Sequence, residues 1–294
     1  MILPPHILDN GGVAVVTAVN DDAVFNGSLL RSPEMASVKE LRVQRGYASA
    51  GLAYNGGIKT SASPVMVFAH QDIFFPQGWF EFLSQTIREI AIKDPNWGVL
   101  GVYGTGTSGQ AIGHIYSTGL EKVLGHPLEE PQEASSLDEV VLVVRRSAGL
   151  QFDEALPGFH LYGTDICLQA RNQGLKCYVV SDFCIHNSNG LSVLPSDYIR
   201  AFLYMRRKWR GHLPVKTPCM LITRWGIPLL QHNLAVWTKV MFNRYPVGKR
   251  CADPSALYRR LLREGRIQNL VAAQREISGG QAPVCCAAQE ASDH

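Results

Sequence analysis

The chain has 294 residues, 46% of them hydrophobic and 18% charged, and its formal net charge is +3. This length and composition fit a soluble globular protein with one large α/β domain, or with one domain and a smaller appendage. They argue against a membrane-spanning protein, because no run approaches the roughly 18 to 20 uninterrupted apolar residues of a membrane span. Residues 1–6 lack the charged start and apolar run of a signal peptide, and the seven cysteines form no CxxC pair. We therefore expect a cytoplasmic protein.

Strands and helices are predicted to alternate in the first half of the chain. Residues 13–19 are an apolar run that predicts a buried strand, and residues 38–43 predict a more exposed one. Residues 49–59 have the small side chains and the spacing of a helix. A buried strand over residues 65–69 and an amphipathic helix over residues 79–93 follow. This alternation implies right-handed crossovers and a mostly parallel sheet.

A glycine-rich loop follows the apolar strand predicted over residues 97–103. Its sequence, Gly-Thr-Gly-Thr-Ser-Gly over residues 104–109, has neither the GxGxxG spacing nor the Lys-Ser/Thr ending of a phosphate-binding loop, and no clear helix follows it. We interpret this segment as a turn or a mobile loop. The missing dinucleotide fingerprint also argues against an oxidoreductase, which is otherwise possible for any α/β chain.

The second half of the chain predicts fewer elements. A strand over residues 137–145 is followed by a helix that begins at Thr164 or Asp165 and by a strand over residues 176–181. The remaining sequence indicates helices around several prolines. We expect a first domain over residues 1–195, a basic helical region over residues 196–277 and a disordered tail over residues 278–294.

Formal charge is distributed unevenly along the chain. Residues 1–199 hold 12 Lys+Arg and 20 Asp+Glu, a net −8, whereas residues 200–294 hold 16 and 5, a net +11, and the two sum to +3. Basic and aromatic residues alternate between Tyr204 and Arg210, which suits phosphates or an anionic surface such as the inner face of a membrane. A solvated amphipathic helix with snorkelling arginines would show the same pattern. Nucleic acid is not an expected partner, because no RNA- or DNA-binding motif accompanies these charges.

The triplet His70-Gln71-Asp72 is the most informative segment of the chain, because it follows the buried strand of residues 65–69 directly. In open α/β sheets, ligands bind at the carboxyl ends of the strands, so a polar cluster at such an end is a candidate site. The alternative is that Asp72 only caps the loop or the helix that follows.

Several segments, in the expected order, make residues 12–195 resemble the family 2-type glycosyltransferases, and specifically a small bacterial branch of them. The resemblance implies an α/β fold of the GT-A-like type, which is the Rossmann-type fold of nucleotide-diphospho-sugar transferases. In this fold a mostly parallel mixed sheet is flanked by helices, and a helical C-terminal region follows. It also implies metal-dependent and inverting transfer of a sugar from a nucleotide-diphospho-sugar, by default a UDP-sugar, to an acceptor hydroxyl. The segments are Thr17 to Asp22, residues 53–58, His70-Gln71-Asp72, Gly163-Thr164-Asp165 and His186.

A divalent metal site is implied at three positions of this family pattern. Asp72 matches the last acid of the family's Asp-x-Asp motif, His70 stands where its first acid usually is, and His186 matches a histidine that completes the metal shell in many relatives. A diphosphate leaving group needs a divalent cation, and imidazole ligands favour Mn²⁺ over Mg²⁺. The alternatives are that His186 caps a turn and that His70 is a satisfied core histidine.

The acceptor side of the reaction is implied by residues around a helix start. Asp165 matches the second residue of the family's Glu-Asp pair, while Thr164 replaces the Glu. Because an inverting transferase needs a base within hydrogen-bond reach of the attacking hydroxyl, the resemblance assigns that role to Asp165, with helix capping as the alternative. His160 and Tyr162 are close enough in sequence to line the sugar or acceptor pocket. The acceptor, a glycan or a lipid-linked molecule, is not identified.

Nucleotide contacts are implied in both halves of the chain. No acid at the end of the strand of residues 38–43 corresponds to the family's nucleobase-binding residue. Since one metal-binding acid and the Glu before Asp165 are also missing, the alternative function is a UDP- or nucleotide-sugar-binding protein with weak or lost transfer. The residues implied to contact the nucleotide are Thr17, Ala18, Asn20, Asn55, Gln71, Asp72, Lys208 and Arg210.

Overall fold

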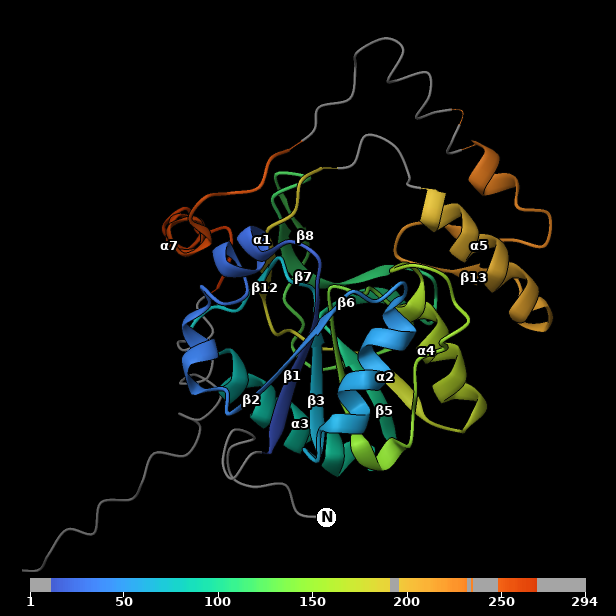
Figure 1. The fold of residues 1–294 in the computed structure, drawn as a ribbon, viewed down its shortest axis with the longest axis horizontal. Coiled ribbons are helices and arrows are strands. Elements are labelled where there is room, and N and C mark those ends of the chain that lie inside the picture. Colours follow the sequence, from blue (N-terminus) through green and yellow to red (C-terminus); the bar gives the residue numbers. More distant parts are fainter. Residues whose placement is uncertain (1–11, 191–195, 232–233, 235–247, 269–294) are drawn as a thin grey trace, which may run out of the picture.

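The computed structural model describes residues 12–190, 196–231, 234 and 248–268. A large sheet runs through the molecule, and helices cover both of its faces (Figure 1). The strands are β1 (Val13–Val19), β2 (Glu40–Arg45), β3 (Val65–Ala69), β4 (Ile73–Phe74), β5 (Trp97–Gly101), β6 (Tyr103–Gly106), β7 (Ala111–Ser117), β8 (Lys122–Gly125), β9 (Gln132–Leu137), β10 (Val141–Arg145), β11 (Lys176–Val179), β12 (Cys184–His186), β13 (Val215–Lys216) and β14 (Leu221–Ile222). The helices are α1 (Asp22–Gly27), α2 (Ala50–Thr60), α3 (Trp79–Lys93), α4 (Tyr162–Asn172), α5 (Ser196–Lys208) and α7 (Pro254–Arg263), with the 3₁₀ helices η2 (Pro33–Ser37), η3 (Arg146–Ala148) and η4 (Arg210–His212) and a helical stretch over residues 227–231.

The described strands of the large sheet follow the order β2-β1-β3-β10-β5-β11-β9-β6-β7-β12-β4, and β8 pairs with β7. Parallel pairing joins β1 to β2 and β3, β5 to β11, and β7 to β12, and the other described pairs are antiparallel. The strand β10 lies antiparallel between β3 and β5. Residues just before β10 therefore lie at the edge of the sheet where β3 ends.

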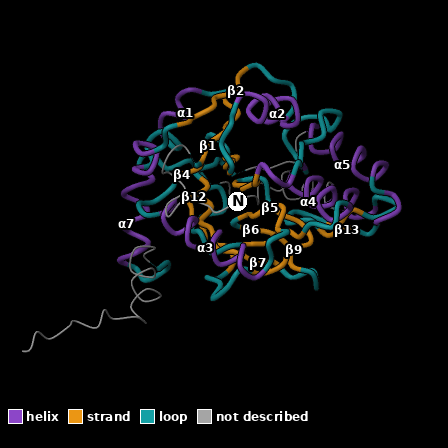
Figure 2. Tube along the Cα trace, turned by 90° about the horizontal axis from the view of Figure 1, so that it is seen from below, coloured by secondary structure: helices purple, strands orange, loops and turns teal. Residues whose placement is uncertain are grey.

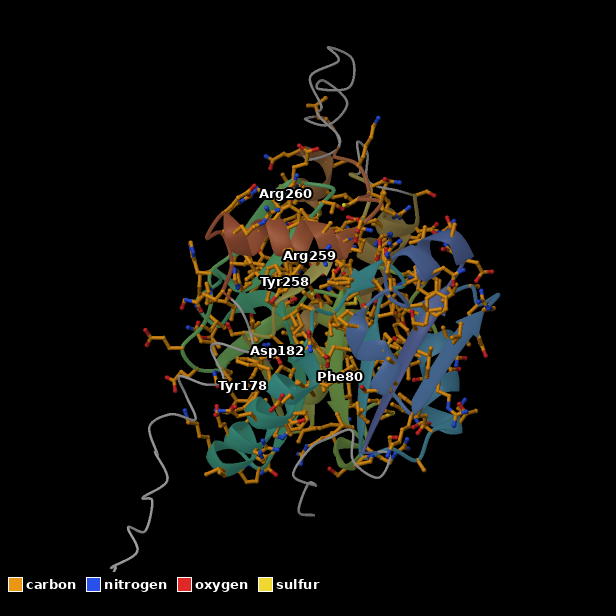
Figure 3. All side chains as sticks on the ribbon, turned by 90° about the vertical axis from the view of Figure 1, so that its left-hand side faces the viewer. Phe80, Tyr178, Asp182, Tyr258, Arg259 and Arg260 are labelled. Atoms are coloured by element: carbon orange, nitrogen blue, oxygen red, sulfur yellow. The ribbon has the colours of Figure 1, made fainter. Side chains whose placement is uncertain are left out.

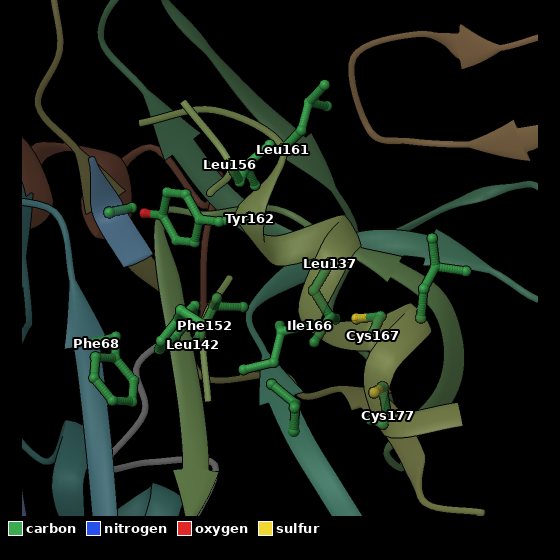
Figure 4. Close-up of a cluster of buried hydrophobic side chains, with 14 of the residues drawn as sticks. Phe68, Leu137, Leu142, Phe152, Leu156, Leu161, Tyr162, Ile166, Cys167 and Cys177 are labelled. Carbon is green, nitrogen blue, oxygen red and sulfur yellow. The ribbon is translucent and has the colours of Figure 1, made fainter. Parts of the chain in front are cut away.

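Both faces of the central strands are buried, because successive residues belong to two different cores. In β3, Val65 and Val67 pack into the core on the α3 side, while Met66 and Phe68 pack into the core on the α2 and α4 side. Figure 4 shows part of this second core, in which Phe68 lies near Leu142 of the neighbouring strand β10. A strand buried on both faces has a continuous apolar sequence, which is why the pattern of residues 65–69 predicted it.

The first core is closed by helices from opposite ends of the chain. Trp79 and Leu83 of α3 are fully buried there, and Leu257 and Leu261 of α7 pack into the same core. Asp253 caps α7 by accepting a hydrogen bond from the N–H of Ala256. Figure 3 views this side of the molecule, with α7 lying across the sheet. The end of the described chain thus returns to the N-terminal half of the fold.

The predicted fold class is confirmed, since the molecule is a mixed α/β protein with helices on both faces of a mixed sheet. The sheet is less parallel than expected, because β10 and the strands β6 to β9 pair antiparallel. Residues 104–109 are also more regular than expected: they contain the end of β6 and the turn that leads to β7. The strand patterns of residues 65–69 and the helix pattern of residues 79–93 appear with the predicted bounds.

The region after residue 195 is helical only in part, because β13 and β14 form a hairpin within it. Its helix α5 packs into the second core through Phe202 and Met205, whereas α7 packs into the first. The predicted disordered tail, residues 278–294, lies outside the described residues. Within the described residues, no helix has both the length and the apolar character needed to cross a membrane.

Candidate functional site

A cavity of about 550 Å³ opens where β1, β2 and β3 end. Its walls include Ala18 and Asn20 from the end of β1, Tyr47 from the loop after β2, and Gln71 and Asp72 from the loop after β3. This edge of an α/β sheet is where nucleotides bind in many unrelated proteins, because strand ends present backbone and polar groups there. The cavity is therefore the leading candidate for a ligand site.

Three potential metal ligands meet beside this cavity. His70, Asp72 and His186 each offer one ligand atom, and these atoms lie within 4.8 Å of one another. Asp72 Oδ1 is 3.4 Å from His186 Nε2 and 3.9 Å from His70 Nδ1. Two imidazoles and one carboxylate suit a divalent transition-metal ion and leave coordination positions for oxygen atoms of a ligand. The three residues thus fit a metal site by their chemistry as well as by their spacing.

Hydrogen bonds to the Tyr162 hydroxyl identify the free nitrogen of His70. This hydroxyl donates its proton to the carbonyl oxygen of Glu139 at 3.1 Å. At 2.8 Å from His70 Nε2 it must then act as the acceptor, so Nε2 carries the proton. The lone pair of His70 is left on Nδ1, the nitrogen that lies nearer to Asp72. This is the tautomer that a metal ion on the Asp72 side requires.

The charge states of Asp72 and His70 suit a bound cation, and His186 would have to lose its proton to join them as a ligand. Burial opposes ionisation of Asp72, but His186, His70 and Arg250 together hold the pKa of Asp72 well below its usual range. Burial lowers the pKa of His70 to about 4, although the Asp72 charge acts in the opposite direction. Burial would lower the pKa of His186 as well, but the charge of Asp72 and its hydrogen bond raise it above the ordinary value. Near neutral pH, Asp72 is an anion and His70 is uncharged.

Backbone pairing brings His186 to Asp72. The short strand β4 begins directly after Asp72, and it pairs antiparallel with β12 so that Ile73 lies opposite His186. In addition, the N–H of Asn187 donates to the carbonyl oxygen of Asp72 at 2.8 Å. The relative position of the two ligands is thus set by main-chain hydrogen bonds.

Two acidic residues that the sequence did not single out lie at the same edge of the sheet. Asp138 and Glu139 precede β10, and the N–H of His70 donates to the carbonyl oxygen of Val140 at 3.1 Å. Both acids are half-buried. In the sequence, these residues are an acidic pair that precedes an apolar run. That pattern places them at the candidate site only if β10 is known to run antiparallel to β3.

The carboxyl groups of this acidic pair differ in their surroundings. Burial raises the pKa of Asp138, although the charge of His186 opposes the change. Burial, with the charge of Asp138, raises the pKa of Glu139 to about 8. The N–H groups of Leu161 and Gly163, at the start of α4, stabilise the Glu139 carboxylate. Glu139 is therefore bound to the end of a helix, whereas Asp138 interacts electrostatically with the metal-ligand candidate His186.

A basic residue from the end of the described chain also reaches the cluster. One terminal nitrogen of Arg250 lies 3.9 Å from Asp72 Oδ2, and Arg250 Nε donates to the carbonyl oxygen of Asn187 at 2.9 Å. The adjacent Cys251 exchanges two hydrogen bonds with the Asn187 side chain, at 2.7 and 2.9 Å. The guanidinium is thus fixed beside the three ligand candidates. No local sequence signal marks Arg250, because its partners are distant in the chain.

Three of the predicted nucleotide contacts, besides Asp72, line the cavity: Ala18, Asn20 and Gln71. The Gln71 side-chain oxygen accepts hydrogen bonds from the N–H groups of Asn20 and Asp21, both at 3.1 Å. Its amide nitrogen donates to the side chain of Asn20. Gln71 therefore holds the loop after β1 against the loop after β3 and orders this wall of the cavity.

Thr17 and Asn55 are not found in the cavity wall. Thr17 is fully buried, because alternate residues of a strand face opposite sides and its neighbour Ala18 takes the cavity side. Asn55 is buried in α2, where its side chain exchanges hydrogen bonds of 2.9 Å with the backbone of Phe152 and donates to Glu154. Neither side chain is part of the described cavity wall, so both nucleotide contacts stay predictions.

Asp165 and Lys208 form an ion pair that does not line the cavity. Asp165 is 1% exposed, and its carboxylate accepts hydrogen bonds from Lys208 Nζ at 2.7 and 2.9 Å, from Trp209 Nε1 at 2.7 Å and from Gln169. Burial raises the pKa of Asp165, although Lys208 opposes the change. Lys208 also binds Asp153 at 2.6 Å. The pair joins α4 to α5, so the predicted contact between Lys208 and a diphosphate is not supported.

The other predicted side chains lie at different distances from the ligand candidates. Tyr162, predicted to line a sugar pocket, is fully buried behind His70, and its role is to orient that imidazole. His160 is half-buried and packs edge-on against Tyr198, next to the cavity residue Phe159. Arg210 is exposed on η4 and is not in the cavity wall, so its predicted contact with the nucleotide is not supported either.

Residues 14–201 match the family described as "Glycosyltransferase like family", and this range includes the cavity and all three metal-ligand candidates. The chain belongs to this glycosyltransferase-like family. Membership confirms the resemblance to glycosyltransferases that the sequence segments implied, while the bacterial branch stays a prediction. Arg250 lies outside the matched range, on the segment that returns to the site.

Individual relatives of this glycosyltransferase-like protein are distant. The protein named "ATP synthase subunits region ORF 6" from Fuscovulum blasticum is 30% identical over 157 residues, which are 51% of this chain and 61% of that protein. The structure of GalNAc-T7 with UDP, GalNAc and Mn²⁺ has a TM-score of 0.46 at 11% identity, covering 68% of this chain and 49% of the other. The mannosyltransferase PcManGT from Pyrobaculum calidifontis, in complex with GDP-Man and Mn²⁺, has a TM-score of 0.43 at 12% identity, covering 92% of this chain and 79% of the other.

Proposed function

We propose that this protein is a metal-dependent, inverting glycosyltransferase that takes its sugar from a UDP-sugar. The observation that carries the proposal is the cluster of His70, Asp72 and His186 beside a cavity large enough for a nucleotide. Family membership supports the reaction class. A divalent cation held by these three residues would neutralise the diphosphate of the donor as it becomes the leaving group.

The donor would lie along the cavity with its diphosphate at the end that holds Asp72 and with its base at the opposite end, near the loop after β2. Gln44 and Tyr47 line that second end. Uracil presents one N–H between two carbonyl oxygens, and the amide of Gln44 can pair with such an edge while the Tyr47 ring stacks on the base. Within the described cavity wall, Asp72 is the single carboxylate, and it is engaged at the other end. The N–H and NH₂ donors of guanine would lack a carboxylate partner, so uracil is the better fit.

The transfer step needs a proton acceptor, and we assign it to Asp138. The acceptor hydroxyl attacks the anomeric carbon, the bond from that carbon to the diphosphate oxygen breaks, and the nucleotide leaves with the electron pair. The carboxylate of Asp138 takes the hydroxyl proton. Its raised pKa makes it a stronger base than an ordinary aspartate, and it lies at the edge where β3 ends.

A nucleotide-sugar-binding protein without transfer is the second candidate function. It is favoured by Asp165, because the acid that the family resemblance names as the base is 1% exposed and fully engaged by Lys208, Trp209 and Gln169. If Asp138 cannot act as the base in place of Asp165, the protein would bind the donor and release the donor unchanged.

A donor panel separates these two functions. The purified chain would be incubated with UDP- and GDP-sugars, with and without Mn²⁺, and free nucleotide would be measured by chromatography. We expect Mn²⁺-dependent release of UDP from at least one UDP-sugar, in hydrolysis or in transfer to added glycan acceptors. Tight binding of UDP and Mn²⁺ in calorimetry without release from any donor would support the binding protein and overturn the transferase.

We assign Arg250 to the diphosphate of the donor, because its guanidinium lies 3.9 Å from Asp72. Arg250→Ala is then expected to weaken binding of UDP in the presence of Mn²⁺ by about tenfold or more, because this charge-assisted contact is lost. Calorimetry with UDP and with uridine compares the two ligands. Uridine lacks phosphates, so its affinity should be the same for wild type and Arg250→Ala. Equal UDP affinity in the two proteins would contradict the assignment.

A matched control for this change is Arg259→Ala, which removes an exposed arginine from α7 and should leave UDP affinity unchanged.

Lys208→Ala tests the prediction from the sequence that Lys208 contacts the diphosphate. Because Lys208 is bound to Asp165 and Asp153, its removal is expected to lower the melting temperature rather than the UDP affinity of the folded protein.

A further inference from the structure

Large apolar side chains are exposed together on one stretch of the C-terminal region. Trp225 is 78% exposed, Ile227 51%, Leu230 67% and Leu234 64%. Scattered single apolar residues are normal on a protein surface, but four exposed ones within ten positions indicate a partner. We call these four residues the apolar face.

The conformation of this stretch is fixed by packing on α5, and that packing turns the apolar face outward. Leu229 is buried in the second core, and Gly226 lies so close to Phe202 and Arg206 of α5 that an added Cβ would contact both. Ile227, Leu230 and Leu234 follow the spacing i, i+3, i+7 of one side of a helix, and residues 227–231 are helical. The buried side therefore holds the stretch in place while the exposed side remains without a partner among the described residues.

The sequence on both sides of the apolar face is strongly basic. Between Asp197 and Asp253 the sequence contains no Asp or Glu, and it contains 11 Lys and Arg, namely Arg200, Arg206, Arg207, Lys208, Arg210, Lys216, Arg224, Lys239, Arg244, Lys249 and Arg250. Among the described ones, Arg207, Arg210, Lys216 and Arg224 are exposed. They belong to α5, η4, β13 and the segment before Trp225, which form one lobe beside α4 in Figure 1.

We propose that this lobe docks on an anionic membrane surface. The apolar face would enter the boundary between lipid head groups and acyl chains, with Trp225 at the level that tryptophan prefers in bilayers. The exposed basic residues around it would attract acidic head groups. Neither feature is needed for the cavity or the metal ligands, so the proposal does not depend on the transferase activity.

Charge favours a membrane over a second copy of the chain as the occupant. Two copies meeting through this lobe would bring their exposed arginines and lysines together, and the one acidic residue of α5, Asp197, is already paired with Arg200. A lipid surface with negative head groups offers both the apolar interior and the opposite charge. Attraction of this kind weakens with salt, which gives the interaction a measurable signature.

Vesicle co-sedimentation tests the proposal. The full chain would be mixed with vesicles of phosphatidylcholine alone and of phosphatidylcholine with phosphatidylglycerol, at low and high salt. We expect binding to the anionic vesicles that falls as salt rises, and little binding to the neutral ones. Absence of binding to anionic vesicles at low salt would overturn the proposal.

Three variants resolve the contributions. Trp225→Ala with Leu230→Ala should weaken vesicle binding by about tenfold or more, and Arg207→Gln with Arg224→Gln should weaken it mainly at low salt. Ile92→Ala is the matched control, since Ile92 is 85% exposed but lies on α3, away from this lobe. If both lobe variants, with unchanged melting temperatures, bound vesicles like the Ile92→Ala control and wild type, the lobe would not be the docking surface. If Trp225→Ala with Leu230→Ala instead converted a dimer to a monomer in light scattering, the face would be a self-interface and the membrane proposal would fail.

Discussion

Asp72→Asn is expected to abolish Mn²⁺-dependent binding of UDP, with a loss of at least about 10²-fold in affinity, or roughly 2.7 kcal/mol. Asp72 supplies the negative charge of the cluster, and the amide of asparagine has the same shape without that charge. The main-chain bond from Asn187 to the carbonyl oxygen of residue 72 is unaffected, so the fold should persist. Calorimetry with UDP, with and without Mn²⁺, measures the effect.

Glu130→Gln serves as the control for this experiment, because Glu130 is an exposed carboxylate whose partner is Lys93 and it lies outside the cavity wall. It should bind UDP and Mn²⁺ like wild type. A folded Asp72→Asn protein with unchanged UDP affinity in Mn²⁺ would show that the cluster does not hold the metal.

The second large effect is expected at Asp138. Asp138→Asn should lower turnover by a factor of about 10² or more, because the proton acceptor is lost. It should change UDP and Mn²⁺ binding far less, because Asp138 acts on His186 only through its charge. Steady-state release of UDP from the active donor, together with calorimetry, separates turnover from binding. Wild-type turnover in the Asp138→Asn protein would contradict the assignment of Asp138 as the proton acceptor.

Asp165 provides the comparison, since family resemblance and structure assign it different roles. Its carboxylate accepts hydrogen bonds from Lys208 and from the buried N–H of Trp209, so Asp165→Ala should cost about 1–3 kcal/mol of stability. Asp165→Asn retains an oxygen acceptor and should recover most of that stability and most of the turnover. If Asp165→Asn kept the wild-type melting temperature but lost turnover, Asp165 would be the base and Asp138 would not.

Local patterns predicted the parts of the fold that depend on local burial. The strand of residues 65–69 is buried on both faces and therefore apolar throughout, and the helix of residues 79–93 has one apolar side. The triplet after the strand led directly to His70, Gln71 and Asp72, all of which line the cavity. Each of these features depends on residues within about twenty positions of one another, so it could be predicted from the sequence alone.

Strand direction is not encoded in this way, and the acidic pair was missed for that reason. In a parallel sheet, acids that precede a strand lie at the edge opposite to the site. Because β10 is antiparallel, Asp138 and Glu139 lie instead at the edge where β3 ends. The predicted helix start at Thr164 or Asp165 is two or three residues late, because α4 begins at Tyr162 and Asp165 lies in its first turn. The partner of Asp165, Lys208, comes from α5, and no local pattern indicates this contact or the burial of the Asp165 carboxylate.

Arg250 is another residue that local sequence patterns do not predict, because its partners are far away in the chain. The sequence predicts that Lys208 and Arg210 contact the diphosphate, yet the guanidinium beside Asp72 belongs to a segment after residue 247. Its position depends on two hydrogen bonds between Cys251 and the side chain of Asn187. Such a contact can be found only when the whole fold is known.

The return of the chain to its first half also bears on how the protein is made. Val13 and Trp79 share a core with Leu257, Leu261 and Ile267. During synthesis this apolar surface stays uncovered until almost the entire described chain has left the ribosome, because its last covering helix is encoded near the end. A nascent chain that halted before residue 248 would therefore expose core side chains and be prone to aggregate. Completion of folding is late in this protein, and a shortened domain that ends near residue 195 would be a poor substitute for the full chain.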